Sequence, residues 1–294
     1  MPVPERPKTT APPAPSAPSA PAAPAARSTS SAPPSLRERR RATAVREILD
    51  AAELHITEHG PEGLSLRAVA RSLGMTVQAL YHYFPNRHAL VTMLVTKGYE
   101  DLFAAVQAAV DSTADSTADS TAGAGGTAAD PVADRPFVSR LLDAAEGYRG
   151  WAIAHPERFK LLFGTPLRGY AAPADGASTV AARRMSTIFQ RELFGGFSPE
   201  QLAAADMPPL SPQFRAYLDQ LPPDGPGVLP PPAIALLMEA WGRMHGMVVL
   251  EVFGHTSFLG DHEAELFHLA MRNMLADIHR RIPGSADVVE AGAV

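Results

Sequence analysis

Apolar residues recur every three or four positions over most of this chain, which is the spacing that places them on one face of an α-helix. Residues 35–59 are the clearest case, and their single apolar stripe consists of Val45, Ile48, Leu49, Ala52 and Ile56. Ser35 and Glu38 have the spacing of a capping box at the start of this helix, and Gly60-Pro61 is expected to end it. No segment alternates convincingly between apolar and polar residues, so the predicted fold class is all-α.

Two short helices are predicted directly after the first one. Ser65 is expected to cap a helix over residues 66–73, and Gly74 supplies the turn that follows. Thr76 is then expected to cap a third helix that reaches about residue 84. Two short helices joined by a turn with glycine form a helix-turn-helix, in which the second helix enters the major groove of DNA.

The later part of the chain continues the helical pattern. Asn86 is expected to cap a fourth helix that reaches about residue 110. Proline-rich breaks separate several of the subsequent segments. The further predicted helices cover residues 135–154, 156–163, 177–194, 199–205, 212–220, 231–253 and 261–281.

Two low-complexity stretches suggest where the domains begin and end. Residues 1–34 hold eleven prolines and few large apolar residues, so a disordered tail is expected there. Residues 111–134 begin with three tandem copies of Asp-Ser-Thr-Ala and are expected to form a flexible loop between helices. The predicted domains are a DNA-binding domain over 35–92 and a larger helical domain over 93–283, followed by a tail over 284–294.

Composition and charge narrow the classes of function. The chain has no cysteine, which excludes disulfides and thiolate metal sites. We expect a cytoplasmic protein without a secretory signal or a membrane span. Residues 35–97 hold nine Lys and Arg against six Asp and Glu, a balance of +3, whereas residues 98–294 hold fourteen against twenty-four, a balance of −10. The first segment is therefore the one expected to meet a polyanion such as DNA.

The third helix carries the side chains expected to read DNA. Gln can hydrogen-bond adenine with two bonds, and the methyl groups of Ala and Thr can contact the methyl group of thymine. Tyr and Thr hydroxyls more often bond phosphate oxygens. The outward-facing residues of this helix are Thr76, Gln78, Ala79, Tyr81, His82 and Tyr83. The alternative is a small helical bundle that binds no DNA, which would leave these exposed polar and aromatic residues without an explanation.

The stretch "ILDAAELHITEHGPEGLSLRAVARSLGMTVQALYHYFPNRHALV" resembles the DNA-binding domain of the TetR family of bacterial transcriptional regulators. The resemblance covers about residues 44–92 without a gap. It implies that Ser65 and Arg67 contact one backbone of the DNA and that Arg87 holds a phosphate. Arg41, from the arginine cluster at the start of the first helix, is expected to contact DNA as well.

The resemblance implies a regulator that is not an enzyme and needs no cofactor. The expected partners are a double-stranded DNA operator of palindromic sequence, a second copy of the chain in a homodimer, and a small-molecule effector whose binding releases the DNA. A repressor is the preferred interpretation. An activator, a regulator without a ligand, and a helical interaction protein that has lost DNA binding remain alternatives.

The stretch "HITEHG" offers a different class of function. His55, Glu58 and His59 match the H-x-x-E-H spacing of one class of zinc peptidases, since the two histidines lie one helical turn apart. The family pattern at this position has a large apolar residue, here Ile56, packed below the DNA-reading helices. We therefore interpret the match as an accident on a structural helix and predict no metal site.

The C-terminal region carries a second resemblance. "AWGRMHGMVVLEVFG" resembles the TetR C-terminal subgroup named for a Trp-x-x-x-His-Gly motif, here Trp241, His245 and Gly246. A pocket for a partly aromatic ligand with one polar anchor is expected, and the same residues could instead be helical core. The candidate lining residues are Trp151, His155, Phe159, Phe163, Phe189, Trp241 and His245.

The last two predicted helices are the expected dimer surface, as the resemblance implies. Gly242 and Gly246 lie four residues apart and would let another helix approach closely. The alternative is that both helices pack only onto their own domain. The candidate interface residues are Ile234, Leu237, Met238, Val248, Val252, Leu266, Leu269, Ala270, Asn273 and Ile278.

Overall fold

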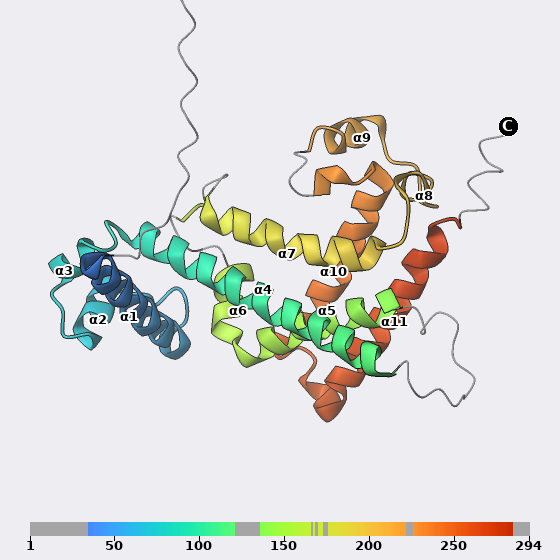
Figure 1. Ribbon diagram of the computed structural model, residues 1–294. Coiled ribbons are helices and arrows are strands. Elements are labelled where there is room, and N and C mark those ends of the chain that lie inside the picture. Colours follow the sequence, from blue (N-terminus) through green and yellow to red (C-terminus); the bar gives the residue numbers. More distant parts are fainter. Residues whose placement is uncertain are drawn as a thin grey trace, which may run out of the picture. The chain divides into compact units, whose positions relative to one another are not determined.

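The structure is a computed structural model that describes residues 35–120, 136–165, 167, 170–172, 176–221 and 226–284. Every regular element among these residues is a helix, which agrees with the predicted all-α fold class (Figure 1). The chain divides into two units, Met1–Arg41 and Ala42–Val294. The α-helices are α1 (Leu36–His59), α2 (Leu66–Ser72), α3 (Val77–Tyr81), α4 (Arg87–Ser120), α5 (Pro136–Ala154), α6 (Pro156–Phe163), α7 (Ala177–Phe194), α8 (Pro199–Ala203), α9 (Pro212–Leu218), α10 (Pro231–Val252) and α11 (Glu263–Arg281), with short 3-10 helices η1 (Pro226–Val228) and η2 (Ser257–His262).

The predicted caps hold the first helices in place. The backbone N–H of Ser35 donates to Glu38 at 2.7 Å and the N–H of Glu38 donates to Ser35 Oγ at 3.2 Å, which confirms the capping box of α1. The first of these hydrogen bonds is the main reason that the pKa of the Glu38 carboxyl lies below its ordinary value. Ser65 and Thr76 cap α2 and α3 with their hydroxyl oxygens, as predicted.

A small apolar core joins α2 and α3 to α1 and to the first turns of α4 and is called the N-terminal core below. Ile48, Ala52 and Ile56 of α1 are fully buried in it, together with Leu80 of α3. Gly74 has φ +65°, the left-handed backbone that the turn between α2 and α3 requires, as the sequence predicted. α3 ends at Tyr81, three residues earlier than expected, because the chain turns at His82 before Phe84 enters the core.

α4 corrects one prediction directly. The sequence predicts a loop over 111–134, but α4 continues to Ser120 and includes two full copies of the Asp-Ser-Thr-Ala repeat. Neither glycine nor proline interrupts this stretch before Gly123, so nothing in the local sequence stops the helix. The remainder of the predicted loop, residues 121–134, lies outside the described residues. So do the predicted tail over 1–34 and all but the first residue of the predicted tail over 284–294.

The larger core, called the C-terminal core below, is built where α4, α5, α7, α10 and α11 meet. α4 packs against both α5 and α7, and α5 also contacts α10 and α11 (Figure 1). Gly147 of α5 lets α4 approach closely, because a Cβ there would lie 2.8 Å from the Cβ of Ala109. Tyr148, the next residue, is fully buried at the centre of this core.

α10 is the one helix among the described residues that is long and apolar enough to cross a membrane by length and composition. This is weak support for a membrane span, since core helices of soluble proteins have the same length and composition. Ala233, Leu236 and Val248 of α10 are fully buried against their own domain, which accounts for the apolar composition of the helix.

Candidate functional site

The exposed face of α3 is the first candidate surface. Gln78, Tyr81 and His82 are exposed, Ala79 is half-buried, and Leu80 between them is fully buried in the N-terminal core. Leu80 therefore packs this short helix onto the core. The exposed side presents the amide of Gln78, the phenol of Tyr81 and the imidazole of His82. This is the arrangement that the sequence predicts for a helix that reads base edges.

Two hydroxyl groups that are expected at the DNA backbone are also helix caps. Thr76 Oγ1 accepts a hydrogen bond from the N–H of Ala79 at 3.1 Å, and Ser65 Oγ accepts one from Ala68 at 3.4 Å. Each hydroxyl uses an oxygen lone pair in its cap, so its proton is still available to donate to a phosphate oxygen. The caps thus fix two donors at the first residues of the two helices.

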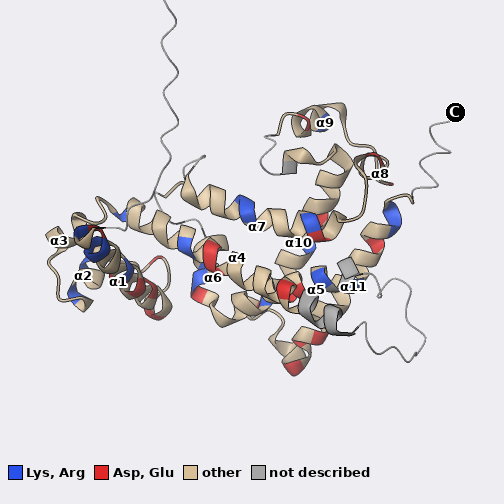
Figure 2. Ribbon diagram, viewed as in Figure 1, with Lys and Arg blue, Asp and Glu red and all other residues tan. Residues whose placement is uncertain are grey.

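Three arginines complete the set predicted at DNA. Arg67 of α2 is exposed, and Arg87 is half-buried because its Nε donates to the carbonyl of Leu64 at 3.4 Å. Arg41 belongs to the N-terminal unit and is exposed in the second turn of α1. Figure 2 shows basic residues, all of them Arg, at the start of α1 and acidic residues nearer its end, so the positive charge of this helix is concentrated in its first turns.

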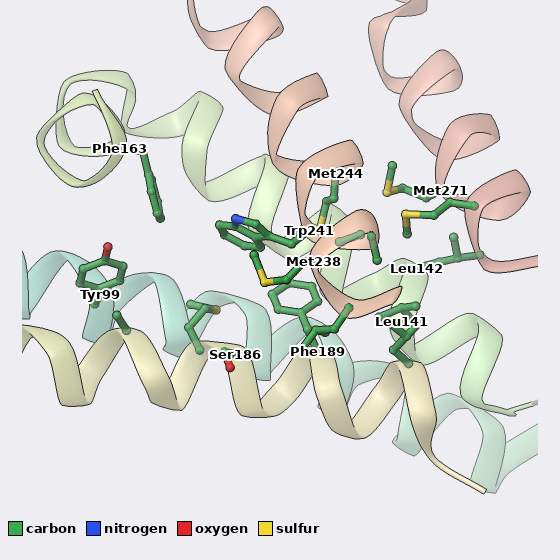
Figure 3. A pocket seen from close by; sticks show the side chains of 17 residues that line it. Tyr99, Leu141, Leu142, Phe163, Ser186, Phe189, Met238, Trp241, Met244 and Met271 are labelled. Carbon is green, nitrogen blue, oxygen red and sulfur yellow. The ribbon is translucent and has the colours of Figure 1, made fainter. Parts of the chain in front are cut away.

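A cavity of about 240 Å³ lies inside the helical region formed by α4, α5, α7, α10 and α11, with one residue from α6. Its walls are almost entirely apolar and aromatic (Figure 3). The lining residues are Tyr99, Leu141, Leu142, Ala145, Phe163, Ala182, Met185, Ser186, Phe189, Leu193, Leu237, Met238, Ala240, Trp241, Met244, Met271 and Met274.

Three of the seven residues predicted to line a pocket do line this cavity, namely Phe163, Phe189 and Trp241. Phe159 is fully buried in the C-terminal core, and its ring lies 5.1 Å from the ring of Phe163. Trp151 stacks on His155 with ring centroids 5.2 Å apart. These last three residues support the wall rather than form it.

His245 was expected to line the pocket, but it stacks on Trp241 and is not among the lining residues. The two rings stack at 4.9 Å with an angle of 8° between their planes, so these residues, one helical turn apart, face the same way. His245 Nδ1 lies 2.8 Å from the hydroxyl of Tyr148, which is its hydrogen-bond partner. Burial lowers the pKa of His245 and raises the pKa of Tyr148, so both groups are held neutral at pH 7.

Sequence reasoning missed most of the cavity wall. Five methionines line it, contributed by α7, α10 and α11, and Tyr99 reaches it from α4. These residues are far apart in the sequence and each fits an ordinary apolar stripe, so helical periodicity alone does not separate them from core residues. The abundance of methionine, ten in the chain, was the available signal, because methionine is common at adaptable binding surfaces.

An ion cluster links α6 to α1 and α4. Lys97 Nζ lies 2.8 Å from both carboxylate oxygens of Glu53, and Arg158 pairs with Asp101 and, at 3.6 Å, with Glu53. The guanidinium of Arg158 also lies over the ring of Trp151 at 5.5 Å. This cluster, which the sequence pattern did not predict, connects the helix that carries Phe163 to a helix of the N-terminal core.

The H-x-x-E-H stretch lies at the end of α1. Nitrogen and oxygen atoms of His55, Glu58 and His59 lie within 4.8 Å of one another, so the three could reach one metal ion. One ring nitrogen of each histidine is already at hydrogen-bond distance from a backbone carbonyl, His55 from Gly63 and His59 from His55, both at 3.2 Å. All three groups come from one turn of a surface helix, and no other described His, Asp or Glu joins the cluster, whereas structural zinc sites have four protein ligands.

Comparisons with known proteins agree with this architecture. Residues 48–94 match the family model described as bacterial regulatory proteins, tetR family, and residues 141–274 match the tetracyclin repressor-like C-terminal domain. These matches do not test the Trp-x-x-x-His-Gly subgroup, which stays a prediction, as do the domain boundaries and the roles of individual site residues.

Relatives of known name are transcriptional regulators of the helix-turn-helix type. The HTH-type transcriptional regulators Mb1846 of Mycobacterium bovis and Rv1816 of Mycobacterium tuberculosis are each 31% identical over 211 residues, which span 71% of this chain and 80% of the relative. The crystal structure of SCO4313, a protein named as regulatory, superimposes with a TM-score of 0.59 at 29% identity and covers 82% of this chain and 100% of that chain. A protein of unknown function from Rhodococcus sp. RHA1 shares the fold, with a TM-score of 0.52, 22% identity, and coverage of 80% of this chain and 94% of that one. The chain therefore belongs to the TetR family and is a DNA-binding, helix-turn-helix transcriptional regulator, not an enzyme.

Proposed function

We propose that the chain is a ligand-responsive repressor that binds a palindromic operator as a homodimer and leaves it when a small molecule occupies the cavity. The observation that carries the proposal is the position of α6. Phe163 of this helix lines the cavity, while Arg158 of the same helix pairs with Glu53 of α1. A ligand that displaces α6 would therefore act on the helix on which the DNA-reading helices pack.

The DNA contacts are proposed residue by residue. Gln78 and Ala79 would read base edges in the major groove, and Thr76, Tyr81 and His82 would contact bases or phosphates at its rim. Ser65, Arg67, Arg87 and Arg41 would hold the sugar-phosphate backbone. The exposure of α3 and the hydroxyl protons left by the two caps support these roles.

The dimer would form through α10 and α11. Met238, Gly242, Gly246 and Leu250 follow one another at four-residue spacing along α10, and Met238 and Leu250 are exposed large apolar residues. A Cβ on either glycine would meet no atom of the described residues within 4 Å, so no described helix of the same chain packs there. On α11, Leu266, Leu269 and Asn273 are exposed in the same way. Two copies of this pair of helices could bury these stripes in a four-helix bundle.

Not every residue expected at the dimer surface remains a candidate. Leu237, Val248 and Ile278 are buried in the C-terminal core of their own chain, and Ile234 is buried as well. All four are therefore removed from the proposed interface. The periodicity of a helix identifies its apolar face, but α10 is apolar on two faces and only packing separates them.

Release of DNA would follow from a difference in affinity. A ligand shifts a protein between two conformers only if it binds one more tightly than the other, and DNA must prefer the opposite conformer. α6 is a short helix of eight residues joined to both cores by side-chain contacts, so it is the proposed moving element. A regulator of this kind would work in the cytoplasm, beside the nucleoid.

A selection of genomic DNA fragments on the purified protein tests this function. The selection is done at near-physiological salt, because weaker binding through phosphates alone is then suppressed. Enrichment of one palindromic motif is expected, and no enrichment would contradict the proposal. Transcription in vitro from an enriched promoter then distinguishes repression from activation, the second candidate function.

A further inference from the structure

The walls of the cavity specify the chemistry of its ligand. Of the seventeen residues that line it, none is Lys, Arg, Asp, Glu or His. An ionised ligand group placed in such a wall would lose its hydration without gaining an ion pair, which is a large free-energy cost. Two lining residues carry a polar side chain other than an indole, Tyr99 and Ser186.

Tyr99 and Ser186 differ in how far their hydroxyl groups are already engaged. Ser186 Oγ accepts a hydrogen bond from Gln190 Nε2 at 2.8 Å, which occupies an oxygen lone pair and leaves the proton of the hydroxyl. Within the described part of the chain, no hydrogen-bond partner is found for the hydroxyl of Tyr99, whose ring contacts the edge of Phe163 at 5.7 Å. Burial raises the pKa of Tyr99, so this hydroxyl stays protonated and can donate at pH 7.

The cavity has two chemically different ends. Figure 3 shows Tyr99 and Phe163 at one end, and Met271 with Leu141 and Leu142 at the other. Methionine side chains are flexible and polarizable, so the second end can adapt to an alkyl chain without a fixed shape. The volume of about 240 Å³ lies just below the usual range for small-molecule sites, which favours a compact ligand.

We infer that the cavity takes a small, uncharged, hydrocarbon-rich molecule with one hydrogen-bond acceptor, of the chemical class of medium-chain ketones and alcohols. The acceptor lies at Tyr99 and the alkyl chain extends toward Met271. This inference deepens the proposed function, on which it rests for the biological meaning of the ligand. The binding chemistry itself can be measured without any DNA.

The test compares three probes that share a ten-carbon chain and differ in charge. Calorimetry at pH 7 on the full-length protein measures the affinities of 2-decanone, decanoate and decylamine. We expect 2-decanone to bind at least about tenfold more tightly than either ion, because only the ions must lose hydration without a partner. Equal or tighter binding of either ion, or no binding of any probe, overturns the inference.

Substitutions test whether 2-decanone binds in the cavity. Ala182→Phe and Ser186→Phe fill the space from α7 and should each weaken 2-decanone binding at least about tenfold, since little room is left for the probe. Val180→Phe, on the same helix but exposed and outside the cavity, should leave the affinity unchanged. Tyr99→Phe should weaken 2-decanone by about twofold to tenfold through loss of one hydrogen bond. Unchanged affinity in both cavity-filling variants, with folding verified by thermal unfolding, would also overturn the inference.

Operator binding is measured separately, so that the two proposals can fail independently. If 2-decanone binds in the cavity but leaves DNA affinity unchanged, the ligand class stands and release by this ligand fails. If the protein selects an operator and decanoate is the tighter probe, the regulator stands and the ligand class fails.

Discussion

Arg158 Nη2, on α6, lies 3.6 Å from Glu53 Oε1, on α1, and the same guanidinium also pairs with Asp101 of α4. Arg158 and Glu53 are each less than one-fifth exposed, so water screens their interaction only in part. Lys97 makes the second contact to Glu53, which means that the carboxylate keeps one partner if Arg158 is removed. Among the described residues, this ion pair joins α6 to α1, a helix of the N-terminal core.

Replacing Arg158 tests whether this link transmits the ligand signal. Arg158→Gln should lower the free energy of unfolding by about 1–2 kcal/mol, between the values for exposed and buried ion pairs. Its larger effect should be on coupling, so that a cavity ligand changes operator affinity less in the variant than in the wild type. Arg191→Gln, which removes an ion pair between two neighbouring residues of α7, Arg191 and Glu192, is the control. If the ligand changes operator affinity equally in wild type and Arg158→Gln, the Arg158–Glu53 pair does not transmit the effect of the ligand.

The pH dependence of stability should carry a contribution from His245. Its pKa is lowered in the folded state from the ordinary value of 6.5, so the unfolded chain binds the proton more readily. The contribution of neutral His245 to the free energy of unfolding is therefore fully present above pH 6.5. It is lost as the pH falls below 6.5 toward the pKa of His245 in the folded state. Urea unfolding between pH 5 and 8 should give a steeper loss of stability on acidification for wild type than for His245→Gln. A parallel decline in both proteins would mean that His245 does not titrate in this way.

A substitution at Gly246 of α10 should prevent dimerisation without destabilising the monomer. Gly246→Leu adds a side chain where the described part of its own chain leaves open space. Leucine also favours a helix over glycine by about 0.5–1 kcal/mol. The monomer should therefore keep or gain stability while the second copy is prevented from approaching. Gly150→Leu on α5 is the matched control, because a Cβ there also meets open space. Light scattering should report a monomer for Gly246→Leu only; a dimer in both variants would remove this face from the interface.

Local signals explain which parts of the fold could be predicted. The caps at Ser65 and Thr76 and the left-handed Gly74 depend on neighbours within four residues, so the sequence alone locates them. The cavity depends on which faces of distant helices meet, and periodicity does not encode that. Met271 therefore could not be distinguished from core, and His245 was expected in the cavity although it hydrogen-bonds Tyr148 behind the wall.

The histidine pair of α1 should not bind zinc tightly. His55, Glu58 and His59 are close enough to share an ion, but one nitrogen of each ring is at hydrogen-bond distance from a backbone carbonyl and the site lies on an exposed helix end. Titration with zinc, followed by calorimetry, should give at most weak binding that His55→Ala and His59→Ala abolish. A tight one-to-one complex that His55→Ala eliminates would contradict the interpretation of this motif as accidental.

The central claim is that the exposed face of α3 reads a DNA sequence. The most direct measurement is the affinity of wild type and Gln78→Ala for the selected palindrome and for a scrambled duplex at the same salt concentration. We predict that Gln78→Ala weakens palindrome binding by about 1–3 kcal/mol, the value of a good base contact, and leaves binding to the scrambled duplex unchanged. Equal losses on both duplexes, or no loss on either, would contradict the account, provided that circular dichroism shows the variant to be folded.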